Sequence, residues 1–162
     1  MSNYVFTKKG AEWVANRIAS AKNTKDIDVM YVVYTNGNIE GLNLTPNMVA
    51  SNLFDEATGI WCLKREGGIV GYSTEGQDGS HIANISCVVT KDDVVAGGSI
   101  PLISNVSKII AVATAISDYP EELISICNVT KSGVAYPIPW IDNISMSVSC
   151  PICVSPYPKE NN

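Results

Sequence analysis

The sequence has one histidine, His81, and lacks the short motifs typical of nucleotide sites and hydrolases. It contains neither Gly-x-Gly-x-x-Gly nor a Walker-type phosphate loop, so we expect no nucleotide site. It also lacks the Gly-x-Ser-x-Gly turn that presents a serine nucleophile. His81 sits in a Gly/Ser-rich stretch with no sequence-adjacent acid to orient it as a general base. We therefore expect a surface histidine, no catalytic residue and no small-molecule substrate.

Long hydrophobic runs are also missing. The longest, Val29 to Val33 and Ile109 to Ala113, fall far short of the roughly 20 residues that a membrane-spanning helix needs. The N-terminal stretch lacks the continuous apolar segment of a secretory signal. We therefore expect no membrane partner and no export. With 162 residues, 46% of them hydrophobic, the chain is large enough for one domain with its own core.

Positive charge is scarce and unevenly placed. The net charge of −5 argues against a nucleic-acid ligand, because binding phosphates requires clustered lysine and arginine. Five basic residues nevertheless precede Asp26, against Glu12 alone: Lys8, Lys9, Arg17, Lys22 and Lys25. This cluster is either a solvated helix face or a surface that docks onto an acidic neighbour.

A helix is predicted near the N-terminus, with Thr7 as its cap, from Lys8 to about Ser20. Apolar residues recur at helical spacing and are expected to face the domain's own sheet: Ala11, Val14, Ala15, Ile18 and Ala19. At 100° per residue, Trp13 then lies on the other side, near Lys9 and Arg17. We expect these three residues to form an interface anchored by Trp13. The alternative is a loop of the same chain that folds over Trp13.

The rest of the chain reads mainly as strands separated by turns. Asn36-Gly37, a strong hairpin-turn dipeptide, should close a strand that begins near Ile27, and Thr45-Pro46 should start a short helix. Further strands are expected at Ile60 to Leu63, Ile69 to Tyr72, Ile82 to Thr90, Lys108 to Ser117, Leu123 to Val129 and Ile144 to Val148. The predicted fold is therefore mostly β with an N-terminal helix (α+β), an antiparallel β-sandwich or barrel.

The C-terminal segment is expected to leave that domain. The prolines after Cys150 exclude a helix and a central strand, so residues 1–150 are assigned to the domain and 151–162 to a proline-rich arm. Pro151, Pro156 and Tyr157 are candidate contacts with another subunit. Cys150-Pro-Ile-Cys153 lacks the following helix of a redox motif and the second ligand pair of a zinc site. We expect two exposed thiols or an inter-chain bridge, with no metal and no cofactor.

Two further patterns leave alternatives open. Asn-x-Ser/Thr triplets occur at Asn43, Asn84, Asn105, Asn128 and Asn143. They fit either glycosylation or the polar-out, apolar-in alternation of half-buried strands, which we favour because four of them have Ile or Val in the middle: Ile85, Val106, Val129 and Ile144. Trp61, Trp140 and Tyr72 could form a sugar-binding platform, although tryptophans in β-domains usually belong to the core.

The order of these elements resembles the small N-terminal or collar-attachment domains of tailed-bacteriophage tail fibres and related baseplate proteins. The resemblance rests on a Thr-x-x-Gly helix start, Thr7-Lys8-Lys9-Gly10-Ala11, on the strand from Val29 to Asn38, and on the late strands Ser107 to Ala113 and Glu122 to Val129. The late Ile-Gly-Leu type motif of such domains is missing, and no long fibre shaft follows.

This resemblance implies a virion structural protein, made in the host cytoplasm and placed in the phage tail. It would be a stand-alone adaptor or attachment subunit of the tail, tail fibre, collar or baseplate. It would work by assembly, as a homo-oligomer and with other virion structural proteins. The alternative is a small carbohydrate- or protein-binding β-sandwich module, and an unrecognised enzyme ranks third.

Overall fold

The fold is built around two adjacent strands, β2 (Val29–Thr35) and β6 (Lys108–Ala115), which pair antiparallel. The computed structural model describes residues 3–19, 25–55, 57–67, 69–75, 79–89, 107–140 and 146–154. All seven side chains of β2 are buried, on both faces of the sheet. The two strands contain the two longest apolar runs of the sequence, and such runs are typical of strands covered on both sides.

These strands are the centre of a six-stranded antiparallel sheet with the order β1-β7-β6-β2-β3, in which β10 also pairs with β6. Its other strands are β1 (Tyr4–Phe6), β3 (Ile60–Glu66), β7 (Ser125–Asn128) and β10 (Ile138–Pro139). A small hairpin of β8 (Thr130–Lys131) and β9 (Val134–Ala135) follows β7.

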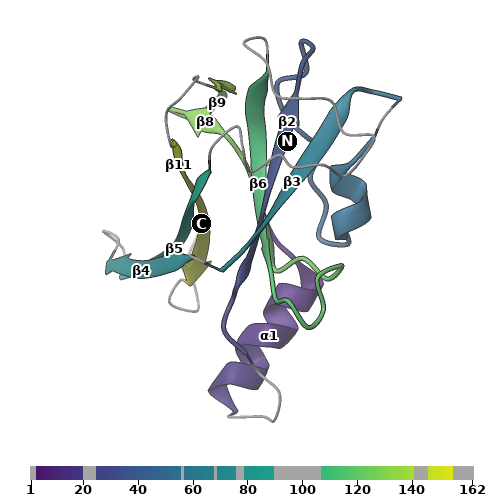
Figure 1. Ribbon diagram of the computed structural model, residues 1–162. Helices are drawn as coiled ribbons and strands as arrows, with labels where there is room; N and C mark the ends of the chain where they lie inside the picture. The colour runs from purple at the N-terminus through teal and green to yellow at the C-terminus, as the bar shows by residue number, and fades with distance from the viewer. Residues whose placement is uncertain are drawn as a thin grey trace.

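A second sheet covers one face of the first (Figure 1). It has three antiparallel strands in the order β11-β5-β4, with β4 (Val70–Glu75), β5 (His81–Val89) and β11 (Met146–Val154). The two sheets share a core in which Met30, Val32 and Tyr34 of β2 pack with residues of the second sheet, such as Cys87 and Val148.

The chain between β2 and β3 covers the opposite face of the large sheet. Leu42 and Leu53, the latter in the 3-10 helix η1 (Ala50–Leu53), pack with Val33 and other residues of β2 and β6. The amide of Asn128 fixes this covering segment, because it accepts from Leu42 N and donates to Leu42 O, both at 2.9 Å. Both faces of the central strands β2 and β6 are therefore covered.

The predicted fold class is confirmed: the chain is mostly β, with antiparallel sheets and the N-terminal helix α1 (Lys8–Ile18). Two local predictions are wrong. Asn36-Gly37 ends β2 but makes no tight hairpin, because β3 begins only at Ile60. Thr45-Pro46 starts no helix, and helical structure begins instead at Ala50.

The predicted boundary after Cys150 is wrong as well. β11 continues through Pro151 to Val154 and pairs with β5 along that length, so residues 151–154 belong to the sandwich. Pro156 and Tyr157 lie outside the described residues. Within the described ranges, no helix combines the length and hydrophobicity that crossing a bilayer requires.

Candidate functional site

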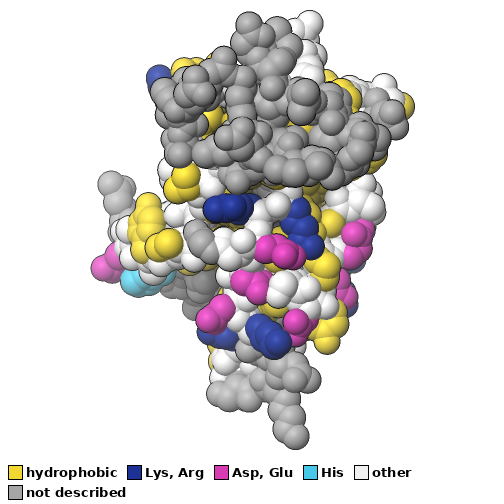
Figure 2. Space-filling view, in the orientation of Figure 1, with side chains coloured by type: hydrophobic (Ala, Val, Ile, Leu, Met, Phe, Trp, Pro, Cys, Tyr) yellow, Lys and Arg dark blue, Asp and Glu magenta, His cyan; other side chains and the backbone are white. Residues whose placement is uncertain are grey.

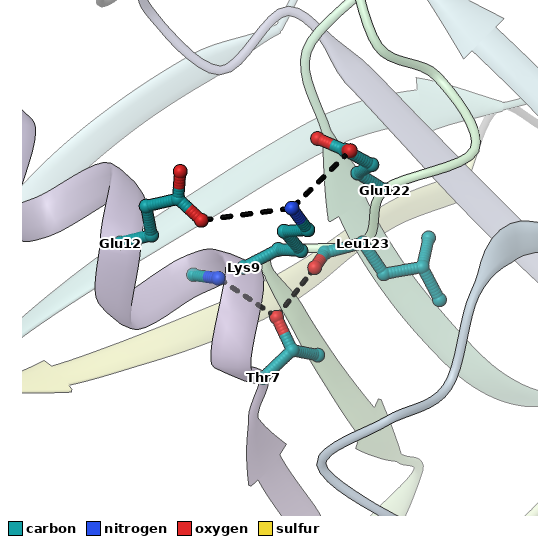
Figure 3. Close-up of polar contacts among 6 residues, drawn as sticks. Thr7, Lys9, Glu12, Glu122 and Leu123 are labelled. Atoms are coloured by element: carbon teal, nitrogen blue, oxygen red, sulfur yellow. Dashed lines mark hydrogen bonds and ion pairs between the residues drawn. The ribbon is translucent and has the colours of Figure 1, made fainter.

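Helix α1 is fixed to the sandwich by its cap residue, Thr7, as predicted for the cap. The buried Thr7 hydroxyl accepts a hydrogen bond from Gly10 N at 2.9 Å and donates to the carbonyl of Leu123 (Figure 3). The backbone N–H of Thr7 donates to Ile124 O at 3.0 Å. One side chain therefore caps the helix and ties it to the segment that enters β7.

Gly10 is the second fixed point of this junction. A Cβ at position 10 would lie 2.2 Å from Ile124 O and 2.9 Å from a ring carbon of Phe6. No side chain fits this gap, because the backbone of Ile124 cannot move away as a flexible side chain could. The Thr-x-x-Gly spacing therefore has a physical cause, since cap and glycine meet the same backbone segment.

Three residues of the basic cluster, Lys9, Arg17 and Lys25, are paired with acids of the same chain. Lys9 lies between Glu12, at 3.6 Å, and Glu122, at 3.5 Å, and these two carboxylates, Glu122 first, raise its pKa (Figure 3). Two further ion pairs lie close by, Arg17 with Asp26 at 2.7 Å and Lys25 with Asp118 at 2.8 Å. Acidic and basic side chains accordingly alternate over this region (Figure 2). The acidic neighbours of these three basic residues are intramolecular.

The helix faces the other way from the prediction. The face turned toward the chain's own structure contains Gly10, which is buried, with Trp13 and Val14, which are half-buried. Four of the five residues of the predicted inward stripe are exposed instead: Ala11, Ala15, Ile18 and Ala19. The close approach at Gly10 selects this orientation, because only the glycine side of the helix can meet Ile124.

Trp13 consequently packs against its own chain, which was the alternative to the interface prediction. Its Nε1 donates to Lys25 O at 2.8 Å, and the Arg17 guanidinium lies 5.6 Å from the centre of its ring. Trp13 and Arg17 form one wall of a groove of about 290 Å³. The structure thus brings Trp13 and Arg17 together, while Lys9 is engaged with Glu12 and Glu122.

The outer face of the three-stranded sheet was not anticipated. Alternation along the paired strands places on it Val70, Tyr72 and Thr74 of β4, Ile82, Asn84, Ser86 and Val88 of β5, and Ser147, Ser149, Pro151 and Cys153 of β11. None of these side chains is charged. Tyr72 is 57% exposed, and hydrophobic side chains gather over β4 beside the histidine (Figure 2). The sequence showed side chains alternating along each strand, but it did not show which strands pair to form this face.

The proposed sugar platform of three aromatic residues is not assembled. Trp140 is 3% exposed and meets Tyr34 edge-on, with 6.4 Å between ring centroids. Trp61 packs on the same Tyr34 at 6.3 Å. Both tryptophans belong to the core, the alternative given for them, and Tyr72 alone is exposed, on the other sheet.

The two cysteines of the C-terminal motif point to opposite faces of β11. Cys150 is fully buried, and Cys153 is exposed. Residues three positions apart in a strand face opposite sides, so these thiols cannot approach each other without disrupting the strand. The expectation of two exposed thiols is therefore wrong for Cys150. Burial raises the pKa of the Cys150 thiol to about 12. Among the described residues, no three His, Cys, Asp or Glu side chains gather as metal ligands would.

His81 is exposed at the start of β5, as expected of a surface histidine. The asparagines of the Asn-x-Ser/Thr triplets differ in their surroundings. Asn128 is buried and bonded to Leu42, so it is no glycosylation acceptor, and its position corrects the polar-out assignment. Asn84 lies half-buried within β5, where a strand was predicted. Asn105 and Asn143 lie outside the described residues.

Fold and surfaces together define an antiparallel β-sandwich protein with a capped N-terminal helix whose apolar side faces outward. No protein-family model, curated protein or solved structure matches this chain.

Proposed function

We propose that this chain is a structural protein of a tailed-bacteriophage virion, an attachment or adaptor subunit of the tail, tail fibre, collar or baseplate. It acts by protein–protein assembly and catalyses no reaction. The observation that carries the proposal is the outward-facing apolar side of α1. A surface helix normally turns its apolar residues toward the core. Here Ala11, Ala15, Ile18 and Ala19 are exposed, which suits a helix that meets another protein.

The anchoring of α1 supports the same proposal. The Thr-x-x-Gly start on which the phage resemblance rests fastens the helix at one end of the sandwich, where it extends beyond the strands (Figure 1). A helix that projects from a rigid body at a fixed angle can set the position of a neighbouring subunit. The pairing of Lys9, Arg17 and Lys25 with intramolecular acids favours protein partners over a phosphate backbone.

Two measurements test this function. Light scattering on the purified protein is expected to give a discrete trimer or larger assembly, alone or with other virion proteins. Electron microscopy of phage particles labelled with an antibody to this protein is expected to show label on the tail. A monomer at every concentration that is also missing from purified particles would contradict the proposal.

The outer face of the three-stranded sheet favours one alternative, a carbohydrate-binding module. A neutral sugar stacks on an aromatic ring and bonds to hydroxyl and amide groups. This uncharged face offers Tyr72 with Asn84 beside it in register, and Ser86 and Ser149 in the next row of the sheet. A glycan array with the wild type, Tyr72→Ala and the control Tyr119→Ala tests it, since Tyr119 is also exposed. Binding lost only in Tyr72→Ala would establish the alternative, and no binding by the wild type would reject it.

A further inference from the structure

The groove beside Trp13 lies between α1 and the three-stranded sheet. Its volume is about 290 Å³, larger than the cavity of about 150 Å³ that holds benzene in a well-known engineered protein. It is lined by Trp13, Arg17, Asp26, Ile27, Ile69, Gly71 and Ile85. One aliphatic side chain from another molecule would fit into it.

The polar groups around the groove are engaged with one another. Trp13 Nε1 donates to Lys25 O, and Arg17 is paired with Asp26 at 2.7 Å. The surface left for an occupant to contact is apolar, formed by the Trp13 ring and the isoleucines of the lining. A charged or strongly polar ligand would gain little here, because it would have to displace existing bonds. The groove therefore selects an apolar side chain.

Such a side chain projects from the same helix. Ile18 is 80% exposed, more than any other large hydrophobic residue that the structure describes. At 100° per residue it lies about 140° around the helix axis from Trp13 and about 100° from Arg17, so it points away from its own groove. Its neighbours Ala15 and Ala19 are exposed and small, which lets another molecule approach the helix closely.

We propose that copies of this chain assemble head to tail, with Ile18 of one copy seated in the groove between Trp13 and Ile85 of the next. This inference rests on the proposed function and names a second copy as the partner of α1. Both halves of the contact are present on every molecule, an aliphatic projection and an apolar groove with no free charge. Projection and groove lie on different faces, so the contact is heterologous and generates either a closed ring or an open filament.

Two variants separate the halves of this contact. Ile18→Asp removes the projection, and the matched control Val134→Asp changes another exposed aliphatic residue, on β9, away from the helix. Gly71→Val fills the groove, since a Cβ at position 71 lies 3.0 Å from Ile85 Cδ1, the movable end of a side chain. Ile18→Ala and Ile69→Trp repeat the two changes with other chemistry if either first variant fails to fold.

The decisive experiment is complementation, read by sedimentation or light scattering. Each variant alone is expected to associate at least tenfold more weakly than the wild type, while Val134→Asp assembles normally. An equimolar mixture of Ile18→Asp and Gly71→Val retains one intact groove and one intact projection, so it is expected to form a one-to-one dimer and nothing larger.

Three results would overturn the inference. If the wild type assembles and the folded variants assemble equally well, this contact is wrong while the proposed function stands. If both variants are monomeric but their mixture stays monomeric, the contact is not between Ile18 and the groove. A wild type that is monomeric at all concentrations rejects self-assembly itself, and with it the homo-oligomer of the proposed function.

Discussion

At the scale of single residues, the position of α1 depends on Thr7 and Gly10. The Thr7 hydroxyl caps the helix and donates a hydrogen bond to Leu123 O. Gly10 matters because it has no side chain: a Cβ at this position would lie 2.2 Å from Ile124 O. The sequence showed both residues in the right spacing. It could not show why the glycine is needed, because the backbone it meets lies more than a hundred positions further along the chain.

Gly10→Ala tests this account. In an exposed helix the change would stabilise by up to about 1 kcal/mol, because glycine is a poor helix former. Here we expect a loss of about 3 kcal/mol in the free energy of unfolding, since the added methyl group overlaps the backbone of Ile124. Urea denaturation measures it. Gly37→Ala is the control, because its Cβ would meet only Thr35 Oγ1 at 3.7 Å. Equal stability of Gly10→Ala and wild type would refute the close contact.

The thiols of Cys150 and Cys153 are expected to differ in reactivity. Cys153 is exposed and should react with Ellman's reagent within seconds to minutes in the native protein. Cys150 is buried, with Ser125 Oγ 3.3 Å from its sulfur, and should react only after unfolding. Comparing Cys153→Ala with Cys150→Ala under native conditions assigns the fast phase. A fast phase that survives in Cys153→Ala and disappears in Cys150→Ala would contradict the orientation of β11.

At the scale of elements, the prolines after Cys150 were interpreted too broadly, because Pro151 lies within β11. They exclude a central strand, but β11 is an edge strand, and an edge position can lack a backbone donor on its free side. The face of α1 was misjudged for a different reason. Its stripe consists largely of alanines, which gain little from burial, so the periodicity identified the helix without deciding which side packs inward.

Removing the end of β11 should therefore damage the sandwich. A chain ending at Cys150 loses the pairing of residues 151–154 with β5 and the burial of Ile152, and we expect a loss of about 3 kcal/mol in the free energy of unfolding. A chain ending at Val154 keeps all of β11 and is expected to retain wild-type stability. Thermal melts compare the two. If both truncations melt like the wild type, Ile152 contributes nothing to the core.

At the scale of the whole molecule, the strands were predictable and their arrangement was not. The apolar runs at Val29 and Ile109 marked the central strands, because such runs are typical of strands buried on both faces. The pairing of β1 with β7 and of β11 with β5 joins distant segments, and no local pattern specifies it. The groove and the uncharged face depend on that pairing, so neither was visible in the sequence.

Stability is expected to fall in alkaline solution. Burial raises the pKa of Cys150 from 9.0 to about 12 and that of Tyr34 from 10.0 to about 12. Above pH 9 the unfolded chain releases protons that the folded chain keeps, so the free energy of unfolding decreases as pH rises toward 12. At pH 10.5 Cys150 alone accounts for a loss of about 2 kcal/mol relative to pH 8.

Urea denaturation at pH 8 and pH 10.5, under reducing conditions, checks this dependence. Cys150→Ala is expected to be less stable than the wild type at pH 8, because it leaves a cavity, yet to lose less stability on going to pH 10.5. Cys153→Ala is the control and should keep the wild-type dependence. An unchanged pH dependence in Cys150→Ala would show that this thiol titrates normally in the folded protein.

The junction of α1 with the segment at Leu123 also governs the order of events during synthesis. Thr7 and Ile124 are 117 positions apart, so neither the pairing of β1 with β7 nor the hydrogen bonds of Thr7 to this segment can form until most of the chain has left the ribosome. A nascent chain must hold its early residues unpaired while the central strands form. The outward side of the helix is then presented at its final angle only on folded molecules, so the subunit contacts that we propose for it would form only after folding is complete.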